Sequence, residues 1–473
     1  MATIDTVIIY AYLVAMVLLG FYASYRQEDA EDYYVAGRRL GTFSIACLWL
    51  ATWVGGASIL GTATRAYELG ITAAWYVLSL ALGCLLFGLF FAARIKKLSE
   101  EFGFITYPDL IEQRFDSRTR IVATLATCLT NIAFVASQLV AAAAIMQVLL
   151  GWEFETALMV AGLAVVVYTA TGGFLAVTYT DWVQFLLLFF GVIVIGVPVA
   201  LDAAGSWSDL RAALPAGHFD LGAWGWANVI PLSVSIVLSF FVVMDSYTRC
   251  YAARTPSAAR NGTLLAVLFM FPIAIAATWL GLASAVLFPG VENTNGILVT
   301  FVSETFPTGL KGLLLVGILA AVMSTADISI LVVSANLTRD VYQRFINPGV
   351  SDQRMRRLGI AASFVTGLLA VFLALYMQDI IDALMLGFTV TSASLILPTL
   401  LALFSNRRNP AAAFWSSVLA LLAVIVWYVA SERGLGGVFS LNPLWAGLLT
   451  SFGIYGLLEG MRLASGSSRE AEA

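Results

Sequence analysis

Histidine, cysteine and charged residues are all scarce in this chain of 473 residues. The single histidine, His218, argues against a histidine-based metal centre or proton relay. No phosphate-binding glycine loop is present, so transport driven directly by ATP is not expected. Charged residues make up 11% of the chain, whereas a soluble domain has about a quarter. The four cysteines have no paired spacing and indicate small buried residues rather than disulfides or metal ligands: Cys47, Cys84, Cys128 and Cys250.

The chain is instead rich in apolar residues. Hydrophobic residues make up 60% of the chain, and the mean hydropathy is +0.90. Apolar stretches of about 20 residues recur from end to end, which predicts an all-α, polytopic membrane protein. We predict about thirteen transmembrane helices, at 6–25, 40–66, 72–93, 119–150, 156–175, 180–202, 228–251, 262–288, 310–342, 357–377, 380–404, 410–431 and 441–463.

The basic residues predict how these helices are oriented. With the N-terminus outside, all but four of the 25 Lys and Arg fall on the cytoplasmic side. The four that remain outside are Arg65, Arg211, Lys311 and Arg433. We therefore expect an integral protein of the plasma (inner) membrane with a cytoplasmic C-terminus.

Two adjacent glycines lie near the middle of the 40–66 span, in Thr52-Trp53-Val54-Gly55-Gly56. Glycines loosen a helix, and an unwound segment in a membrane leaves carbonyls that an ion or a substrate can satisfy. Trp53 beside this break predicts one wall of a substrate pocket, through stacking or cation–π attraction, although simple packing is the commoner role of such a residue. We assign Trp53, Gly55 and Gly56 to the substrate site.

A second signal lies in the 310–342 span, where two hydroxyl residues and a carboxylate follow one another closely. Hydroxyl and carbonyl oxygens together can replace the water shell of a sodium ion with little fixed charge. The alternative is that the hydroxyls bond their own helix and allow close packing. The glycine break and the buried carboxylate favour the ion site. Its expected ligands are the carbonyls of Ala51, Val54 and Ala321 and the hydroxyls of Ser324 and Thr325.

Three carboxylates fall within predicted spans. Asp327 is a functional candidate by default, because a buried carboxylate costs about 2.5–3.5 kcal/mol on insertion scales, although it could instead pair with another helix. Asp245 is a substrate candidate together with nearby Tyr247, but Arg249 four residues on could simply pair with it. Asp181 begins the 180–202 span and could merely cap that helix.

These motifs resemble the sodium/solute symporter family, which includes carriers of proline, pantothenate, sugars, sialic acid and choline. The resemblance covers nearly the whole chain. It rests on several motifs in the family's order, of which the strongest are Ala51-Thr52-Trp53-Val54-Gly55-Gly56, Tyr179-Thr180-Asp181-Trp182 and Ala321-Val322-Met323-Ser324-Thr325-Ala326-Asp327.

The resemblance implies the leucine-transporter fold, with two inverted five-helix repeats at about 40–202 and 228–404. A first helix and a cytoplasmic loop (1–39) would precede them, and two helices with a short tail (405–473) would follow. The family's usual sodium site matches the five oxygens named above. Asp181 matches an acid that some members place on the sodium exit path or at a second sodium site, which could also involve Asp327. The central helix of the second repeat, Ile230–Tyr247, has no glycine, so the sequence does not show whether it unwinds.

Within the family, Trp53 and Asp327 are most similar to the high-affinity choline transporter branch. The other aromatic residues of that branch's cage are replaced, by rough alignment, with Leu80, Val135 and Val243, so choline is not established. Our hypothesis is a cationic or zwitterionic amine, such as choline or an amino acid. A sugar or an organic anion is the alternative.

The predicted function is therefore sodium-coupled import of a small polar organic solute by alternating access, without enzymatic activity. The expected partners are the solute, sodium and the lipid bilayer, with no nucleic acid. A membrane-embedded solute sensor is the rival from another class, and uptake without signalling would discriminate between the two.

Overall fold

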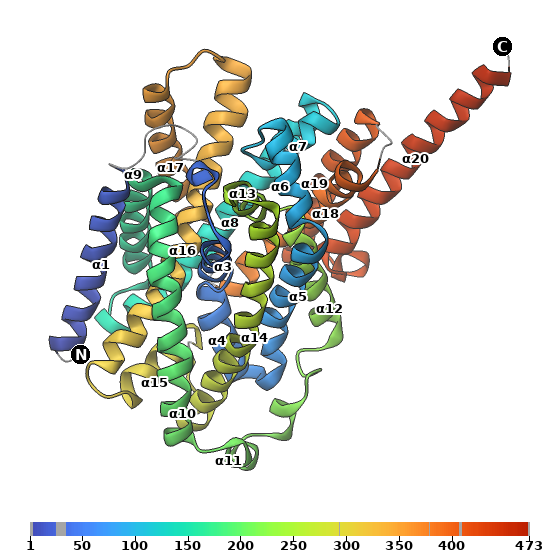
Figure 1. Ribbon diagram of the computed structural model, residues 1–473. Helices are drawn as coiled ribbons and strands as arrows, with labels where there is room; N and C mark the ends of the chain where they lie inside the picture. Colours follow the sequence, from blue (N-terminus) through green and yellow to red (C-terminus); the bar gives the residue numbers. More distant parts are fainter. Residues whose placement is uncertain (1–2, 25–34, 293, 378, 406–408, 472–473) are drawn as a thin grey trace.

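The computed structural model describes residues 3–24, 35–292, 294–377, 379–405 and 409–471. These residues are helical almost throughout, and one parallel bridge joins Leu40 to Ala253. Figure 1 shows them as a bundle of long helices, with the N-terminus at lower left and the C-terminus at upper right. The longer helices are α1 (Thr3–Ser24), α3 (Thr42–Trp53), α4 (Thr62–Leu69), α5 (Trp75–Phe90), α6 (Ala92–Phe102), α7 (Tyr107–Arg114), α8 (Ser117–Leu150), α9 (Phe154–Leu188), α10 (Val197–Ala204), α11 (Trp207–Ala213), α12 (Trp226–Phe240), α13 (Met244–Ala252), α14 (Pro256–Leu287), α15 (Ile297–Thr305), α16 (Leu310–Ala335), α17 (Asp352–Tyr376), α18 (Ile380–Phe404), α19 (Pro410–Glu432) and α20 (Pro443–Ala471), with π-helical segments η2 (Ala57–Gly61), η4 (Phe189–Gly196) and η7 (Asn336–Ile346).

Nine helical segments in the described parts of the chain are long and apolar enough to cross a membrane. Shorter apolar helices accompany them at Ile4–Met16, Thr42–Trp53 and Phe154–Val167. The fold is therefore that of an all-helical membrane protein. The predicted number of thirteen spans is not confirmed, because several helical segments of the structure are longer or shorter than the spans predicted from the sequence. For example, Ala57–Phe90 counts as one segment although it contains a turn at Gly70, where φ is 81°.

Contacts with α14 show that the chain reverses at this turn. Ile45 of α3 lies against Gly262, and Ala63 of α4 lies against Gly281, so these helices run parallel to α14. Gly88 of α5 lies back against Leu264, so α5 runs antiparallel to it. The predicted spans at 40–66 and 72–93 thus correspond to two antiparallel passes.

The stretch from α9 to α10 also contains two passes. Gly162 lies against Val371 of α17, and Val166 lies against Gly367, so this part runs antiparallel to α17. Further along, Leu187 lies against Gly317 and Gly191 against Leu314, so that part runs antiparallel to α16. α16 continues into η7, and the chain then turns back into α17, so that the Ser334 hydroxyl donates to the Gly359 carbonyl at 2.9 Å. Because α16 and α17 thus run antiparallel, the two parts of the α9–α10 stretch run in opposite directions.

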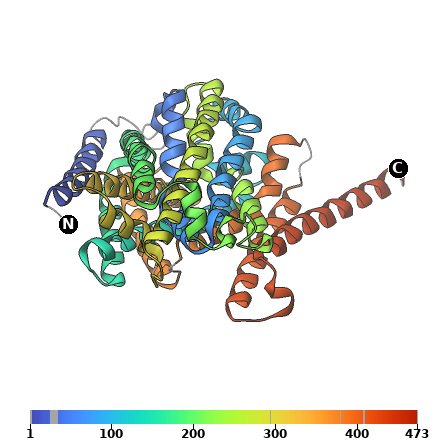
Figure 2. The ribbon, with the colours of Figure 1, turned by 90° about the horizontal axis from the view of Figure 1, so that it is seen from below.

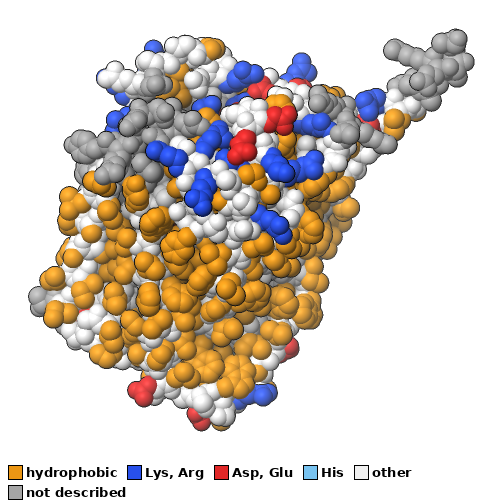
Figure 3. Space-filling view, viewed as in Figure 1, with side chains coloured by type: hydrophobic (Ala, Val, Ile, Leu, Met, Phe, Trp, Pro, Cys, Tyr) orange, Lys and Arg blue, Asp and Glu red, His pale blue; other side chains and the backbone are white. Residues whose placement is uncertain are grey.

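The outer surface is divided into an apolar band and a charged end. Figure 3 shows apolar side chains over the middle of one face and Lys and Arg gathered above them, at what we term the basic end. Leu268, Ile275 and Leu368 are more than 60% exposed on the helices of the bundle, as expected of side chains that face lipid. The end of α20 projects beyond the body at this same end (Figures 1 and 2). Three basic residues assigned to the cytoplasmic side lie outside the described residues: Arg26, Arg407 and Arg408.

α16 lies at the centre of the bundle. Every residue from Leu314 to Ala335 is buried, and the helix contacts α1, α3, α8, α9 and α17. A helix that is apolar all round is typical of a fully enclosed position. The polar side chains in its middle must therefore find their partners within the protein.

The helix formed by α12 and α13 is interrupted without any glycine. Residues 241–243 separate the two parts, and Val242 and Val243 both donate their amides to the carbonyl of Ser239. The Tyr247 hydroxyl donates to the Phe241 carbonyl at 2.6 Å. A tyrosine side chain thus satisfies the carbonyl that the break exposes, which explains how this helix unwinds without a glycine.

At the basic end, Arg120 joins three elements into one ion-paired cluster. Its guanidinium pairs with Glu112 of α7, with Asp340 of η7 and, at 2.8 Å, with Asp109. Glu112 also accepts a hydrogen bond from Arg344 at 2.9 Å. Burial raises the pKa of the Glu112 carboxyl, but hydrogen bonds from Ser117, Arg344 and Arg120 outweigh this effect and hold the pKa below its ordinary value of 4.5.

Glu112→Gln is expected to destabilise the protein by about 1–3 kcal/mol near neutral pH, because Arg120 and Arg344 lose a buried charged partner. Since the folded-state pKa of Glu112 is lowered, its stabilising effect is present above the ordinary pKa and is lost as the pH falls through the folded value. The melting temperatures of variant and parent should therefore converge in acid. Thermal unfolding in detergent across pH measures this, with exposed Glu101→Gln as the matched control. A constant gap at all pH values would contradict the ionic origin.

Candidate functional site

The hydroxyls of Ser324 and Thr325 lie against the backbone at the end of α3. Ser324 Oγ lies 2.6 Å from the Ala51 carbonyl oxygen and 3.1 Å from that of Ala321. Thr325 Oγ1 lies 2.6 Å from the Thr52 carbonyl oxygen and 3.3 Å from that of Ala321. Two hydroxyls and three carbonyls from two distant segments thus form one buried oxygen cluster.

This cluster exists because α3 stops in mid-bundle. The helix ends at Trp53, and Val54 has non-helical angles (φ −98°, ψ 54°). The Gly56 amide donates at 2.8 Å to Oε1 of Gln138 on α8, and the Trp53 carbonyl accepts from the Ser58 hydroxyl at 2.8 Å. Side chains thus replace the amides that would normally bond the last carbonyls of a helix.

The glycine pair allows the backbone to approach its neighbours closely. A Cβ on Gly55 would overlap the Thr325 hydroxyl and lie 3.2 Å from the Ala321 carbonyl oxygen. A Cβ on Gly56 would lie 2.8 Å from the Cβ of Ala141 and 2.9 Å from Gln138 Oε1. Both glycines are therefore required by packing at the break.

The oxygen cluster fits a monovalent hard cation. All its donors are neutral oxygens, and the Thr52 hydroxyl is buried with no hydrogen-bond partner among the described residues, so it offers a further oxygen. The structure brings together four of the five predicted ligands, Ala51, Ala321, Ser324 and Thr325. It adds Thr52, which the sequence reading missed. Val54 is buried at the break, but in the described chain no hydrogen bond joins it to the hydroxyls.

A second polar region, termed the second cluster, contains the buried carboxylates Asp181 of α9 and Asp327 of α16, two helices that pack against each other. Both side chains are fully buried. Thr169 donates to Asp327 Oδ1 at 2.8 Å, whereas neither oxygen of Asp181 has a hydrogen-bond partner within the described part of the chain. Asp181 lies within electrostatic range of Cys47, one turn before Ala51 on α3. It lies between Val166, in the first pass of this stretch, and Leu187, in the second. The alternative of a simple helix cap stays a prediction.

Asp245 pairs with Arg249 and also faces the central pocket. Its Oδ2 lies 2.9 Å from Arg249 Nη1, while Oδ1 has no hydrogen-bond partner among the described atoms. The Arg249 guanidinium lies over the Trp49 ring at 4.9 Å. Asp245 can therefore pair with Arg249 through Oδ2 and still present Oδ1 to the central pocket.

The central pocket lies beside the oxygen cluster, between α3, α5, α8 and α18. Its aromatic walls are Trp53, Tyr76, Phe134 and Phe388. The predicted residues Trp53, Gly55 and Asp245 line it, whereas Gly56 is engaged with Gln138 and the Tyr247 hydroxyl is used at the second helix break. Polar residues at the pocket include Thr52, Ser58, Gln138, Asp245 and Thr325.

Trp53 is held by other rings. It stacks on Phe240 with centroids 3.8 Å apart, and Phe388 lies parallel to it at 5.9 Å. The pocket's other aromatics come from positions that the rough alignment did not consider, while Leu80, Val135 and Val243 are fully buried apolar residues. Gln138 is a polar residue in an apolar span, and that contrast was the available signal for its role.

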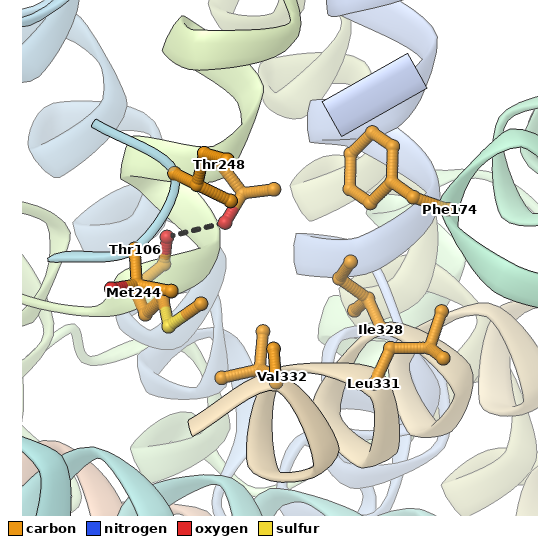
Figure 4. A pocket seen from close by; sticks show the side chains of 9 residues that line it. Thr106, Phe174, Met244, Thr248, Ile328, Leu331 and Val332 are labelled. Carbon is orange, nitrogen blue, oxygen red and sulfur yellow. Dashed lines mark hydrogen bonds between the residues drawn. The ribbon is translucent and has the colours of Figure 1, made fainter. Parts of the chain in front are cut away.

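An apolar crevice lies on the basic side of both clusters (Figure 4). Figure 4 shows Met244 and Thr248 of α13 facing Ile328, Leu331 and Val332 of α16, with Phe174 closing one side. Ile328 directly follows Asp327 in the chain, so this crevice continues from the second cluster toward the basic end. Apolar side chains here separate the polar clusters from that end of the protein.

A family model described as the sodium:solute symporter family matches residues 33–420. The chain belongs to this family. It is 27% identical to the sodium/proline symporter of Escherichia coli over 91% of this chain and 88% of that protein. It is 25% identical to the sodium/sialic acid symporter SiaT of Proteus mirabilis, over 95% of each chain.

Solved structures support the same fold. An outward-open, Na⁺-coupled sialic acid symporter matches with a TM-score of 0.78, at 23% identity over 96% of both chains. Mhp1, a nucleobase-cation-symport transporter, matches with a TM-score of 0.59 at 18% identity, over 93% of this chain and 96% of its own. The chain is thus a membrane transporter of this family, an integral membrane protein, and sodium is its coupling ion.

Gly56→Ala is expected to lower thermal stability by about 1–3 kcal/mol, because the added methyl overpacks the contact with Ala141 and Gln138. Gly453→Ala is the matched control, since a Cβ there meets no atom within 4 Å. Thermal unfolding of both variants in detergent measures the effect. Equal melting temperatures for the two would contradict the close approach at the break.

Proposed function

We propose that this symporter imports a small zwitterionic solute of the amino acid type, together with sodium bound at the break in α3. The class of solute is inferred from the central pocket, which contains, in the described part of the chain, both an unpaired hydrogen-bond acceptor and unpaired hydrogen-bond donors. Asp245 Oδ1 is a buried acceptor, while Gln138 Nε2 and Trp53 Nε1 are buried donors, and none of the three has a hydrogen-bond partner among the described residues. An ammonium group and a carboxylate on one solute would satisfy them together.

Sodium would be held by the oxygen cluster and would couple the two segments that form it. The ligands we propose are the carbonyls of Ala51, Thr52 and Ala321 and the hydroxyls of Ser324 and Thr325. Val54 was also expected from the sequence and stays a candidate. An ion bound there draws α3 and α16 together beside the pocket, and coupling requires that it bind the outward and inward states unequally.

The second cluster is proposed as a second sodium site or as the exit path of the ion. Asp181 supplies a buried carboxylate without a hydrogen-bond partner in the described chain, and Asp327 supplies a second buried carboxylate, which accepts a hydrogen bond from Thr169. The crevice of Figure 4 follows directly toward the basic end. Inward release would then pass from the oxygen cluster to Asp181 and on through this crevice when its apolar walls part.

The arrangement of repeats and the orientation are part of the same proposal. The breaks in α3–α4 and in α12–α13 support inverted repeats at 40–202 and 228–404, because the two broken helices run in opposite directions in Figure 1. The segments at 1–39 and 405–473 would flank them. By the rule for basic residues, the basic end faces the cytoplasm and the N-terminus lies outside.

A quaternary ammonium such as choline is the second candidate, supported by Trp53 and Asp327. Two observations favour the zwitterion over it. The Trp53 ring is stacked on Phe240, and Asp327 accepts a hydrogen bond from Thr169 outside the pocket. The named relatives carry proline and sialic acid rather than choline.

Replacing Ser324 and Thr325 with alanine should raise the sodium concentration for half-maximal uptake by about tenfold or more, or abolish uptake, because two oxygens of the proposed shell are lost and the Ala51 and Thr52 carbonyls stay buried. Uptake into proteoliposomes with a sodium gradient measures this. Ser334→Ala is the matched control, since it removes a similar hydroxyl–carbonyl bond of α16, to Gly359 at 2.9 Å, away from the break. Unchanged sodium dependence in the double variant would contradict the proposal that the oxygen cluster binds sodium.

Thermal-shift screening of amines, amino acids, sugars and carboxylates, with and without sodium, should identify a zwitterion whose stabilisation requires sodium. Asp245→Asn should then weaken its apparent affinity by about tenfold or more, since a charged hydrogen bond to the ammonium is lost. The des-amino analogue should bind parent and variant equally, and sodium alone should still stabilise the variant. Sodium-dependent stabilisation by neutral sugars alone would overturn the zwitterion assignment.

A further inference from the structure

The helix that precedes the proposed repeats presents a polar, buried face to the ion-binding helices. On α1, Asp5, Tyr12 and Met16 are buried and recur at helical spacing, whereas Val7 and Val14 are 57% exposed. α1 packs against α9 and α16, the two helices that carry Asp181 and Asp327. A helix that only faced lipid would have no need of buried polar side chains here.

Asp5 fixes the position of α1 along α16. Its Oδ1 accepts hydrogen bonds from the amides of Gly309 at 2.7 Å and Gly312 at 2.9 Å, at the start of α16. These amides belong to a helix N-terminus, where a carboxylate is favoured by both hydrogen bonding and the helix dipole. Two turns further along α1, Tyr12 is thereby held at a defined depth.

Tyr12 reaches the second polar cluster through Gln184. Gln184 Nε2 donates to the Tyr12 hydroxyl at 3.1 Å, and the Gln184 side chain is buried with no hydrogen-bond partner for its Oε1 among the described residues. Gln184 follows Asp181 by three residues and shares its helix face. A hydroxyl that accepts one hydrogen bond can still donate its own hydrogen.

We propose that Tyr12 is a positioning residue for the cation passing Asp181, and that it acts by orienting the Gln184 amide so that Oε1 faces that carboxylate. This inference rests on the proposed role of the Asp181 cluster. It makes α1 a working part of the ion path, although it lies outside the proposed repeats. A carboxylate and an amide oxygen with no other partner suit a sodium ion, and the tyrosine fixes which amide atom is presented.

The test compares Tyr12→Phe, which removes only the hydroxyl, with Tyr10→Phe, whose side chain is 60% exposed on the opposite part of the same helix. Sodium-activated uptake in proteoliposomes should show a threefold to tenfold higher half-activating sodium concentration for Tyr12→Phe, equivalent to about 0.7–1.4 kcal/mol. Solute affinity in saturating sodium and the behaviour of Tyr10→Phe should stay at the parent level. Gln184→Met should raise the half-activating sodium concentration by the same factor. This variant provides the test if Tyr12→Phe does not fold.

Asp181→Asn separates this inference from the proposed function. In the Asp181→Asn background, Tyr12→Phe should add no further shift, because the group that Tyr12 serves is already lost. If Asp181→Asn shifts sodium activation while Tyr12→Phe and Gln184→Met do not, the Tyr12 inference is overturned and the Asp181 role stands. If Asp181→Asn leaves sodium activation unchanged, the proposed role of the second cluster in sodium binding or release is overturned. Additive shifts in the double variant would show a purely structural role for Tyr12.

Discussion

The structure depends on the requirement that every backbone polar group within a membrane be satisfied by the protein itself. α3 stops halfway through the bundle, so its last carbonyls lack their usual amide partners. Ser324, Thr325 and Ser58 supply hydroxyls to three of these carbonyls, and Gln138 takes the Gly56 amide. The same substitutions that stabilise the break assemble the oxygens from which we build the ion site.

The second broken helix meets the same requirement by other means. Its break has no glycine, and the Tyr247 hydroxyl satisfies the Phe241 carbonyl. Close approach is needed at the first break, where Gly55 and Gly56 lie against Thr325 and Gln138, and it is not needed at the second. Glycine is thus a reliable sign of a break only where another element must pack directly on the backbone.

The sequence predicted those parts of the site that leave a local trace. Adjacent glycines, paired hydroxyls and carboxylates in apolar spans are rare, so the sequence predicts the break in α3 and singles out Ser324, Thr325 and the three aspartates as candidates. Thr52 as a ligand depends on the angle at which α3 unwinds, and no local pattern encodes that angle. Phe134 and Phe388 line the pocket only because α8 and α18 pack there, while in the sequence they are ordinary apolar residues. Tyr12 accepts its hydrogen bond from Gln184, which lies 172 residues further along the chain, and no local pattern reveals so distant a partner.

The enclosure of α16 also bears on the order in which the protein is made. Asp5, Ala51, Thr52 and Thr169 provide partners for the start and middle of α16, and all of them precede it in the chain. Because earlier segments leave the ribosome first, these partners are already in the membrane when α16 is synthesised. Its hydroxyls and carboxylate can therefore be received by the existing bundle at once. The ion-binding helix would then pack into a bundle that already holds these partners, and its polar side chains would not remain exposed to lipid until later helices are made.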